Sequence, residues 1–231
     1  MWQPLRDIRE QEQYGKGLLL LLGTYLLTAV AWRWVDELAG TAFVVILLML
    51  VANQHVPRVL RLTGFAAAAV EVVLSAIRAF SSTEWAIPAH ALSTMVVGAV
   101  AILAIISRLI AHESVTRATV MGAFLAYALV GFSVAFLYIA VDSLSGDPFF
   151  NQGQVPPGDY IYFSLVTLTT VGFGDLTAAT EIGKRLVVIE ALMGQVFLVV
   201  LVARLVSLWK PPTRWPQPQA EPDTDRPGDG G

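Results

Sequence analysis

The stretch that decides the fold runs from residue 167 to residue 175 and reads Thr167-Leu168-Thr169-Thr170-Val171-Gly172-Phe173-Gly174-Asp175. Two glycines flank one aromatic residue. Because glycine adopts positive φ angles without steric cost, this alternation lets successive backbone carbonyls point to the same side. The apolar segment 160–171 that leads into the motif has only about half the length needed to cross a membrane. Non-helical backbone at membrane depth is tolerated only where it lines a cavity or is buried in protein.

The composition agrees with a membrane setting. Of the 231 residues, 55% are hydrophobic and 14% are charged, whereas soluble domains carry about 25% charged residues. The net charge of −3 gives no reason to expect a nucleic-acid partner. The absence of cysteine excludes disulfides, thiolate metal sites and a cysteine nucleophile. No P-loop, dinucleotide-binding or serine-hydrolase motif is present, so the sequence does not predict an enzyme, and it calls for no cofactor.

Six apolar runs are long enough to be membrane-spanning helices, and the half-length segment lies between the last two. We therefore predict an all-α membrane protein with six transmembrane helices plus a re-entrant half-length helix and the loop that follows it. The six runs are 17–32, 38–57, 62–77, 86–107, 118–141 and 186–203.

The distribution of basic residues predicts the orientation. If both termini are cytoplasmic, inner segments hold eleven of the 15 Lys and Arg residues and outer segments hold four, as the positive-inside rule requires. The 167–175 motif then lies at the outer face. In an alternative interpretation, residues 17–28 are the core of a secretory signal cleaved after Ala31. The mixed charges of the preceding segment argue against this alternative.

A row of inward carbonyls, together with the Thr170 hydroxyl, would replace the water shell of a dehydrated monovalent cation. On this motif, residues from about 118 to 209 resemble the pore domain of tetrameric potassium channels, with an outer helix, a re-entrant pore helix, a selectivity-filter loop and an inner helix. The resemblance implies that one group of residues binds K+: Thr170, Val171, Gly172, Phe173 and Gly174. It implies filter support by Thr169 and Asp175. Because Val166 stands where some relatives have a carboxyl group, Tyr162 is the candidate partner of Asp175.

The last apolar run contains candidate gating residues. Gly194 follows Thr170 by 24 residues, where inner helices of the family often have a hinge glycine. Close helix packing is the alternative role for Gly194. Leu198, Val202 and Val206 recur at i, i+4 and i+8, which places them on one helix face. They form either an apolar constriction or an ordinary lipid-facing surface.

Two acidic residues, Glu71 and Glu190, lie inside apolar runs, and such residues often have functional roles. Glu190 is one turn before Gly194 and is placed to brace the pore helix. Glu71 has Arg78 and His90 as alternative partners. The fourth run contains no Arg or Lys, so we do not expect strong voltage gating.

The sequence thus predicts a potassium-selective channel that conducts K+ passively across the plasma membrane as a homotetramer, with membrane lipids around it. A potassium transporter subunit, a weakly selective cation channel and a non-conducting scaffold are the alternatives. The gating stimulus and the role of the first four helices stay unassigned. The predicted divisions are a cytoplasmic segment (1–16), a four-helix region (17–117), a pore domain (118–210) and a disordered Pro-rich cytoplasmic tail (211–231).

Overall fold

The computed structural model describes residues 3–28, 35–51, 57–80, 85–111 and 116–208. These residues form seven helices and two isolated β-bridges, with no strand among them. The helices are α1 (Gln3–Thr28), α2 (Val35–Val51), α3 (Arg58–Phe80), α4 (Ala86–Ala111), α5 (Arg117–Ser145), α6 (Pro157–Leu168) and α7 (Glu181–Leu208).

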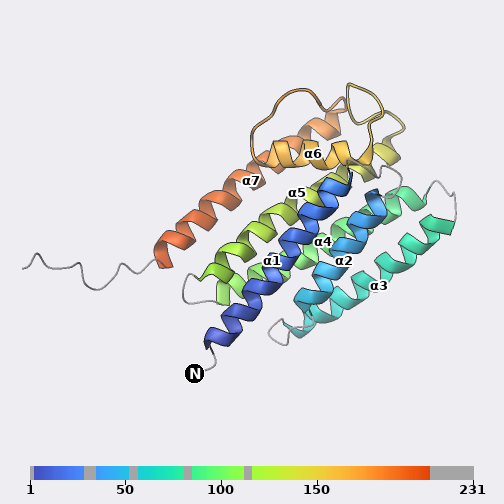
Figure 1. Ribbon diagram of the computed structural model, residues 1–231. Helices are drawn as coiled ribbons and strands as arrows, with labels where there is room; N and C mark the ends of the chain where they lie inside the picture. The colour runs from blue at the N-terminus through green and yellow to red at the C-terminus, as the bar shows by residue number, and fades with distance from the viewer. Residues whose placement is uncertain (1–2, 29–34, 52–56, 81–84, 112–115, 209–231) are drawn as a thin grey trace, which may run out of the picture.

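Helices α1 to α5 lie side by side, and the short α6 lies across one end of this bundle (Figure 1). Four described helical stretches are long and apolar enough to cross a membrane: Arg58–Arg78, Ala86–Ile110, Arg117–Ser145 and Glu181–Arg204. A shorter apolar helix covers Gly40–Leu50. An all-α membrane protein is confirmed, and the count of six spans stays a prediction. Residues 29–32, 52–56 and 209–231, which carry parts of the first two predicted runs, the predicted cleavage site and the predicted tail, lie outside the described residues.

Local sequence signals set the ends of α5 and α6. The Thr116 hydroxyl accepts the backbone N–H of Thr119, which caps the start of α5. Gly146, with φ of 73°, ends the same helix in the left-handed conformation that glycine tolerates. Pro157 occupies the first turn of α6, where a missing N–H costs nothing. These signals leave the loop 147–156 to connect the two helices.

An aromatic cluster fixes α6 against the C-terminal end of α5. Phe149 and Phe150, which follow α5, pack on rings from both helices with centroid separations of 4.7–5.0 Å for the closest pairs. The other rings are Tyr138 of α5 and Tyr160 and Phe163 of α6. Since all five side chains are buried, the cluster holds the start of α6 in place.

Helix α4 packs closely along α5 in the same chain. Gly98 of α4 faces Ser133 of α5 and Phe43 of α2, and a Cβ atom at Gly98 would overlap both side chains. Small residues at such contacts allow membrane helices to approach closely. Helices α1 and α4 pack directly against α5, the helix that leads into α6, and α2 touches it through Phe43, whereas α3 packs against α2 and α4.

Candidate functional site

The loop 169–175, which follows α6, alternates between two backbone conformations. Thr170, Gly172 and Gly174 have positive φ angles of 58°, 54° and 78°, and Val171 and Phe173 between them do not. Among the described residues, Thr170 is the one non-glycine residue with positive φ, a conformation that costs a residue with a Cβ atom about 1–2 kcal/mol. The surrounding structure must therefore hold Thr170 in place.

Backbone hydrogen bonds to the end of α6 hold this loop. The N–H of Thr170 donates to the carbonyl of Thr167 at 2.9 Å, and the N–H groups of Val171 and Gly172 both donate to the carbonyl of Val166, at 3.0 and 3.4 Å. Carbonyls at a helix end lack partners within the helix. The loop amides supply these partners, so consecutive N–H groups all point toward α6.

The direction of the carbonyls follows from the direction of the amides. In a trans peptide unit the C=O of one residue points opposite to the N–H of the next. Because the amides of Thr170, Val171 and Gly172 point toward α6, the carbonyls of the residues before them, Thr169 to Val171, point away from it. The loop thus presents a row of carbonyl oxygens on one side, an arrangement suited to replacing the water ligands of a cation.

The side chains of the loop are largely uncovered within the chain. Val171 is 55% exposed and Phe173 is 69% exposed. The Thr170 hydroxyl accepts a hydrogen bond of 3.4 Å from the amide nitrogen of Gln195 on α7. Sequence analysis did not identify Gln195, although its position one residue after Gly194 places it one turn before Leu198 and two turns before Val202 on the same helix face.

The Tyr162 hydroxyl on α6 donates a hydrogen bond of 2.8 Å to Oδ2 of Asp175, the pairing expected from the sequence. The rings of Tyr162 and Phe173 stack nearly parallel, with centroids 6.5 Å apart. The hydrogen bond from Tyr162 lowers the pKa of Asp175 below its ordinary value. For Asp159, burial first and the nearby Asp175 charge second raise the pKa of the carboxyl group.

A second set of contacts holds the segment after Asp175, and sequence analysis missed it. The Gln152 side chain donates to the backbone carbonyl of Asp175 at 2.8 Å and accepts the N–H of Thr177 at 3.2 Å. The N–H of Asn151 donates to the carbonyl of Thr177, and the N–H of Ala179 donates to that of Phe149. The loop before α6 therefore supports the loop after it.

Helix α7 contacts the end of α6 at Gly194. A Cβ atom at Gly194 would overlap the carbonyl oxygen and side chain of Leu168. The same Leu168 carbonyl accepts a hydrogen bond of 2.8 Å from the Tyr127 hydroxyl on α5. This geometry is the close-packing alternative named for Gly194, and it joins all three helices at the residue that precedes the loop.

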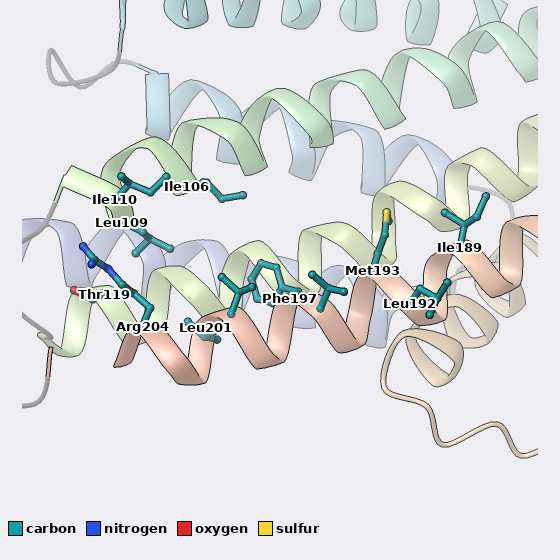
Figure 2. Close-up of a pocket in the computed structure, with 12 residues that line it drawn as sticks. Ile106, Leu109, Ile110, Thr119, Ile189, Leu192, Met193, Phe197, Leu201 and Arg204 are labelled. Atoms are coloured by element: carbon teal, nitrogen blue, oxygen red, sulfur yellow. The ribbon is translucent and has the colours of Figure 1, made fainter. Parts of the chain in front are cut away.

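The candidate gating residues Leu198, Val202 and Val206 lie further along α7, and the latter two are exposed. A groove of about 640 Å³ runs along a different face of α7, between this helix, α4 and the start of α5 (Figure 2). It is apolar except at Thr119 and Arg204, and none of the three candidate residues lines it. Helix α7 thus has two separate apolar faces.

The four-helix region contains a buried polar cluster. His90 Nε2 of α4 lies 3.3 Å from Oε1 of Glu71 on α3, and Thr94 donates to the same oxygen at 2.7 Å. Of the two partners considered for Glu71, His90 therefore lies in contact. Arg108 is buried and donates to the carbonyl of Leu50. The described parts of the chain contain no group of three or more His, Asp or Glu residues that could hold a metal ion.

Comparisons with known proteins agree with this geometry. Residues 121–210, which contain α6, the loop and α7, match a family model described as "Ion channel". This segment is therefore similar to ion-channel proteins. Over 49 residues, the chain is 45% identical to Two-pore potassium channel 4 of Arabidopsis thaliana. That match covers 21% of this chain and 17% of the plant protein. Both matches support a potassium channel family and point to a channel, not an enzyme.

Proposed function

We propose that this protein is a potassium-selective channel in which the loop 169–175 is the selectivity filter. The carbonyls of Thr170, Val171, Gly172 and Phe173 coordinate dehydrated K+, and the Thr170 hydroxyl closes the innermost site. The single observation that carries the proposal is the alternation of positive φ angles at Thr170, Gly172 and Gly174.

Two further features support a cation as the ligand. The loop begins at the C-terminal end of α6, where the helix dipole provides partial negative charge. The permeating ion contacts neutral carbonyls and not carboxylates, so it binds strongly enough to enter the filter and weakly enough to leave it. Gly174 and Asp175 close the outer end of the filter, with Asp175 held by Tyr162.

The working channel in this proposal is a homotetramer, because one chain supplies one filter segment and a ring of carbonyls needs four. The exposed Val171 and Phe173 side chains support this state, since they offer surface for a neighbouring copy. A hollow of about 470 Å³ lies beside the same loop, and Gly172 and Gly174 are among its lining residues. Leu198, Val202 and Val206 face the shared axis in this assembly.

The proposed setting is the plasma membrane, with α6 as a re-entrant helix, six spans and both termini cytoplasmic. The excess of Lys and Arg on the predicted inner side supports this orientation. The fourth helix carries no Arg or Lys before Arg108, so the channel conducts without strong dependence on membrane voltage.

Ion flux into liposomes containing the purified protein tests the proposal. The vesicles carry opposed K+ and Na+ gradients, and Gly172→Asp serves as the inactive control because it places a charge and a Cβ atom at a positive-φ position. We expect uptake that requires K+, is blocked by Ba2+ and is lost in the control. Equal flux of K+ and Na+ would contradict selectivity, and the absence of flux over a range of pH and voltage, from protein that is not tetrameric, would favour a scaffold.

A further inference from the structure

One carboxyl group joins the three helices that build the proposed filter. Glu190 of α7 is 1% exposed. Its Oε2 atom accepts a hydrogen bond of 2.5 Å from the Tyr138 hydroxyl of α5, and its Oε1 atom lies within hydrogen-bond distance of the Ser164 hydroxyl of α6. Ser164 also contacts the backbone carbonyl of Gly131 on α5 at 2.6 Å.

The number of hydrogens in this cluster is limited. A serine hydroxyl has one hydrogen to donate, and a carbonyl or an ionised carboxylate only accepts. Ser164 faces two such acceptors, the Gly131 carbonyl and Oε1 of Glu190. With an ionised Glu190, one of these two oxygen pairs has no hydrogen between its atoms.

A proton on Oε1 of Glu190 resolves this conflict. Glu190 then donates to Ser164, Ser164 donates to the Gly131 carbonyl, and Tyr138 donates to Oε2 of Glu190. Every polar atom of the cluster gains a partner, as buried polar groups require. The titratable groups that face Glu190 from α5 are the phenols of Tyr138 and Tyr127, α6 contributes the neutral Ser164 hydroxyl, and these groups supply no positive charge.

The cluster is connected to the filter through α6. Ser164 lies one turn before Leu168, and the carbonyls between them accept the amides of the loop. Gly194, one turn after Glu190 on α7, packs against Leu168. A shift of α6 relative to α5 or α7 would therefore move the carbonyls that hold Thr170 and Val171.

We propose that Glu190 is a positioning residue of the filter and that it acts as a neutral, hydrogen-bond-donating acid. This inference rests on the proposed function, because its effect is read as ion selectivity. Glu190 does not touch the permeating ion. It fixes α6 between α5 and α7.

Three variants in the full-length protein test the inference by the ratio of K+ to Na+ flux in liposomes. Glu190→Gln keeps the length of the side chain, one donor for Ser164 and one acceptor for Tyr138, so we expect a ratio within about twofold of wild type. Glu190→Leu leaves the buried Tyr138 and Ser164 hydroxyls without this partner, so we expect a loss on the order of tenfold. Glu181→Gln, at an exposed glutamate of the same helix, is the matched control and should leave the ratio unchanged.

The pattern of results decides between outcomes. If Glu190→Gln loses selectivity as Glu190→Leu does, the proposal that Glu190 is a neutral acid is wrong. An unchanged ratio in Glu190→Leu would overturn the positioning role. If Glu190→Leu does not fold, Ser164→Ala takes its place, since it removes the α6 side of the cluster without adding bulk. A wild-type protein that conducts K+ and Na+ equally would contradict the proposed function and not this inference.

Infrared spectroscopy detects the proton on Glu190 independently of any ion flux measurement. The difference spectrum between wild type and Glu190→Gln at neutral pH should contain the C=O stretch of a protonated carboxyl group. Carboxylate bands in place of this C=O stretch would overturn the proposal that Glu190 is protonated, whether or not the protein conducts. Because Glu71 is present in both proteins, its absorption cancels in the difference.

Discussion

The Tyr162 hydroxyl and the Asp175 carboxylate, thirteen residues apart, are joined by a hydrogen bond of 2.8 Å. Tyr162 lies on α6, before the loop, and Asp175 lies at the end of the loop. The bond therefore closes the segment between them, while the amides of Thr170 and Val171 fix its start to α6. The proposed filter is thus held at both ends within one chain.

This bond predicts a pH dependence of conduction. It lowers the pKa of Asp175 below its ordinary value of 3.8. A carboxyl group with a lowered pKa in the folded state stabilises that state above the ordinary pKa, and the contribution is lost as pH falls through the folded-state pKa. We expect K+ flux to fall as the outer pH is lowered through this range, and Tyr162→Phe to move the fall to higher pH. Measuring K+ flux as a function of the outer pH, in wild type and in Tyr162→Phe, checks both the fall and its shift.

Asp159→Asn is the control for this experiment. The pKa of Asp159 is raised by burial and by the Asp175 charge, so Asp159 takes up its proton at higher pH than Asp175 does. A fall in flux that disappears in Asp159→Asn and is unmoved in Tyr162→Phe would assign the effect to the wrong carboxyl group.

Gly194→Ala should weaken the selectivity of the channel. Its Cβ atom would overlap the Leu168 carbonyl, and such overpacking costs about 1–3 kcal/mol. Displacing Leu168 displaces the start of the filter, so the K+ to Na+ flux ratio should fall. Gly23→Ala on α1, where a Cβ atom meets nothing within 4 Å, is the matched control. Reduced flux with an unchanged ratio would instead support the hinge role.

Gln152→Ala should loosen the segment that follows the filter. The variant removes the two hydrogen bonds of Gln152 to Asp175 and Thr177, each contributing about 0.5–1.5 kcal/mol. We expect faster hydrogen exchange at the Thr177 amide, measured by mass spectrometry. Gln154→Ala changes an exposed glutamine in the same loop, and it should leave that rate unaltered. Equal rates in the two variants would exclude the proposed support.

Gly40→Ala should destabilise the four-helix region without changing selectivity. A Cβ atom at Gly40 would lie 2.7 Å from Oε1 of Glu71 and 3.4 Å from Nε2 of His90. Because both side chains are buried, they have little room to yield, and we expect a loss of about 1–3 kcal/mol. Thermal unfolding in detergent measures the loss. A changed K+ to Na+ flux ratio would indicate that the cluster acts on the filter.

The sequence predicted the parts of the site that depend on local backbone chemistry. Gly172 and Gly174 predicted the alternating conformation, because glycine alone reaches positive φ freely. Val166, which stands where some relatives have a carboxyl group, pointed to Tyr162 as the partner of Asp175. The positive φ of Thr170 could not be predicted from its residue type, since the hydrogen bonds to α6 impose it.

Contacts that depend on how helices are rotated against one another were not predictable. The sequence placed Glu190 near the pore helix but named neither Ser164 nor Tyr138, because periodicity gives the buried face of a helix and not its partner. Gln152 lies at an exposed loop position where no periodic pattern applies. Gln195 lies on α7, and its helical spacing from Leu198 was the signal that could have identified it. The spacing of Gly194 favours a hinge, and the close contact with Leu168 is revealed only by the structure.

The close approach of Gly98 to Ser133 and Phe43 has a consequence for engineering. In this protein the face of α5 that carries Ser133 packs against α4 and does not face lipid. A fragment starting at Arg117 would expose this face of α5 to lipid. The pore domain therefore cannot be expressed alone, or fused to a regulatory domain from another protein, without losing the contact with α4. Chimeric channels should therefore take α4 and α5 from the same parent protein.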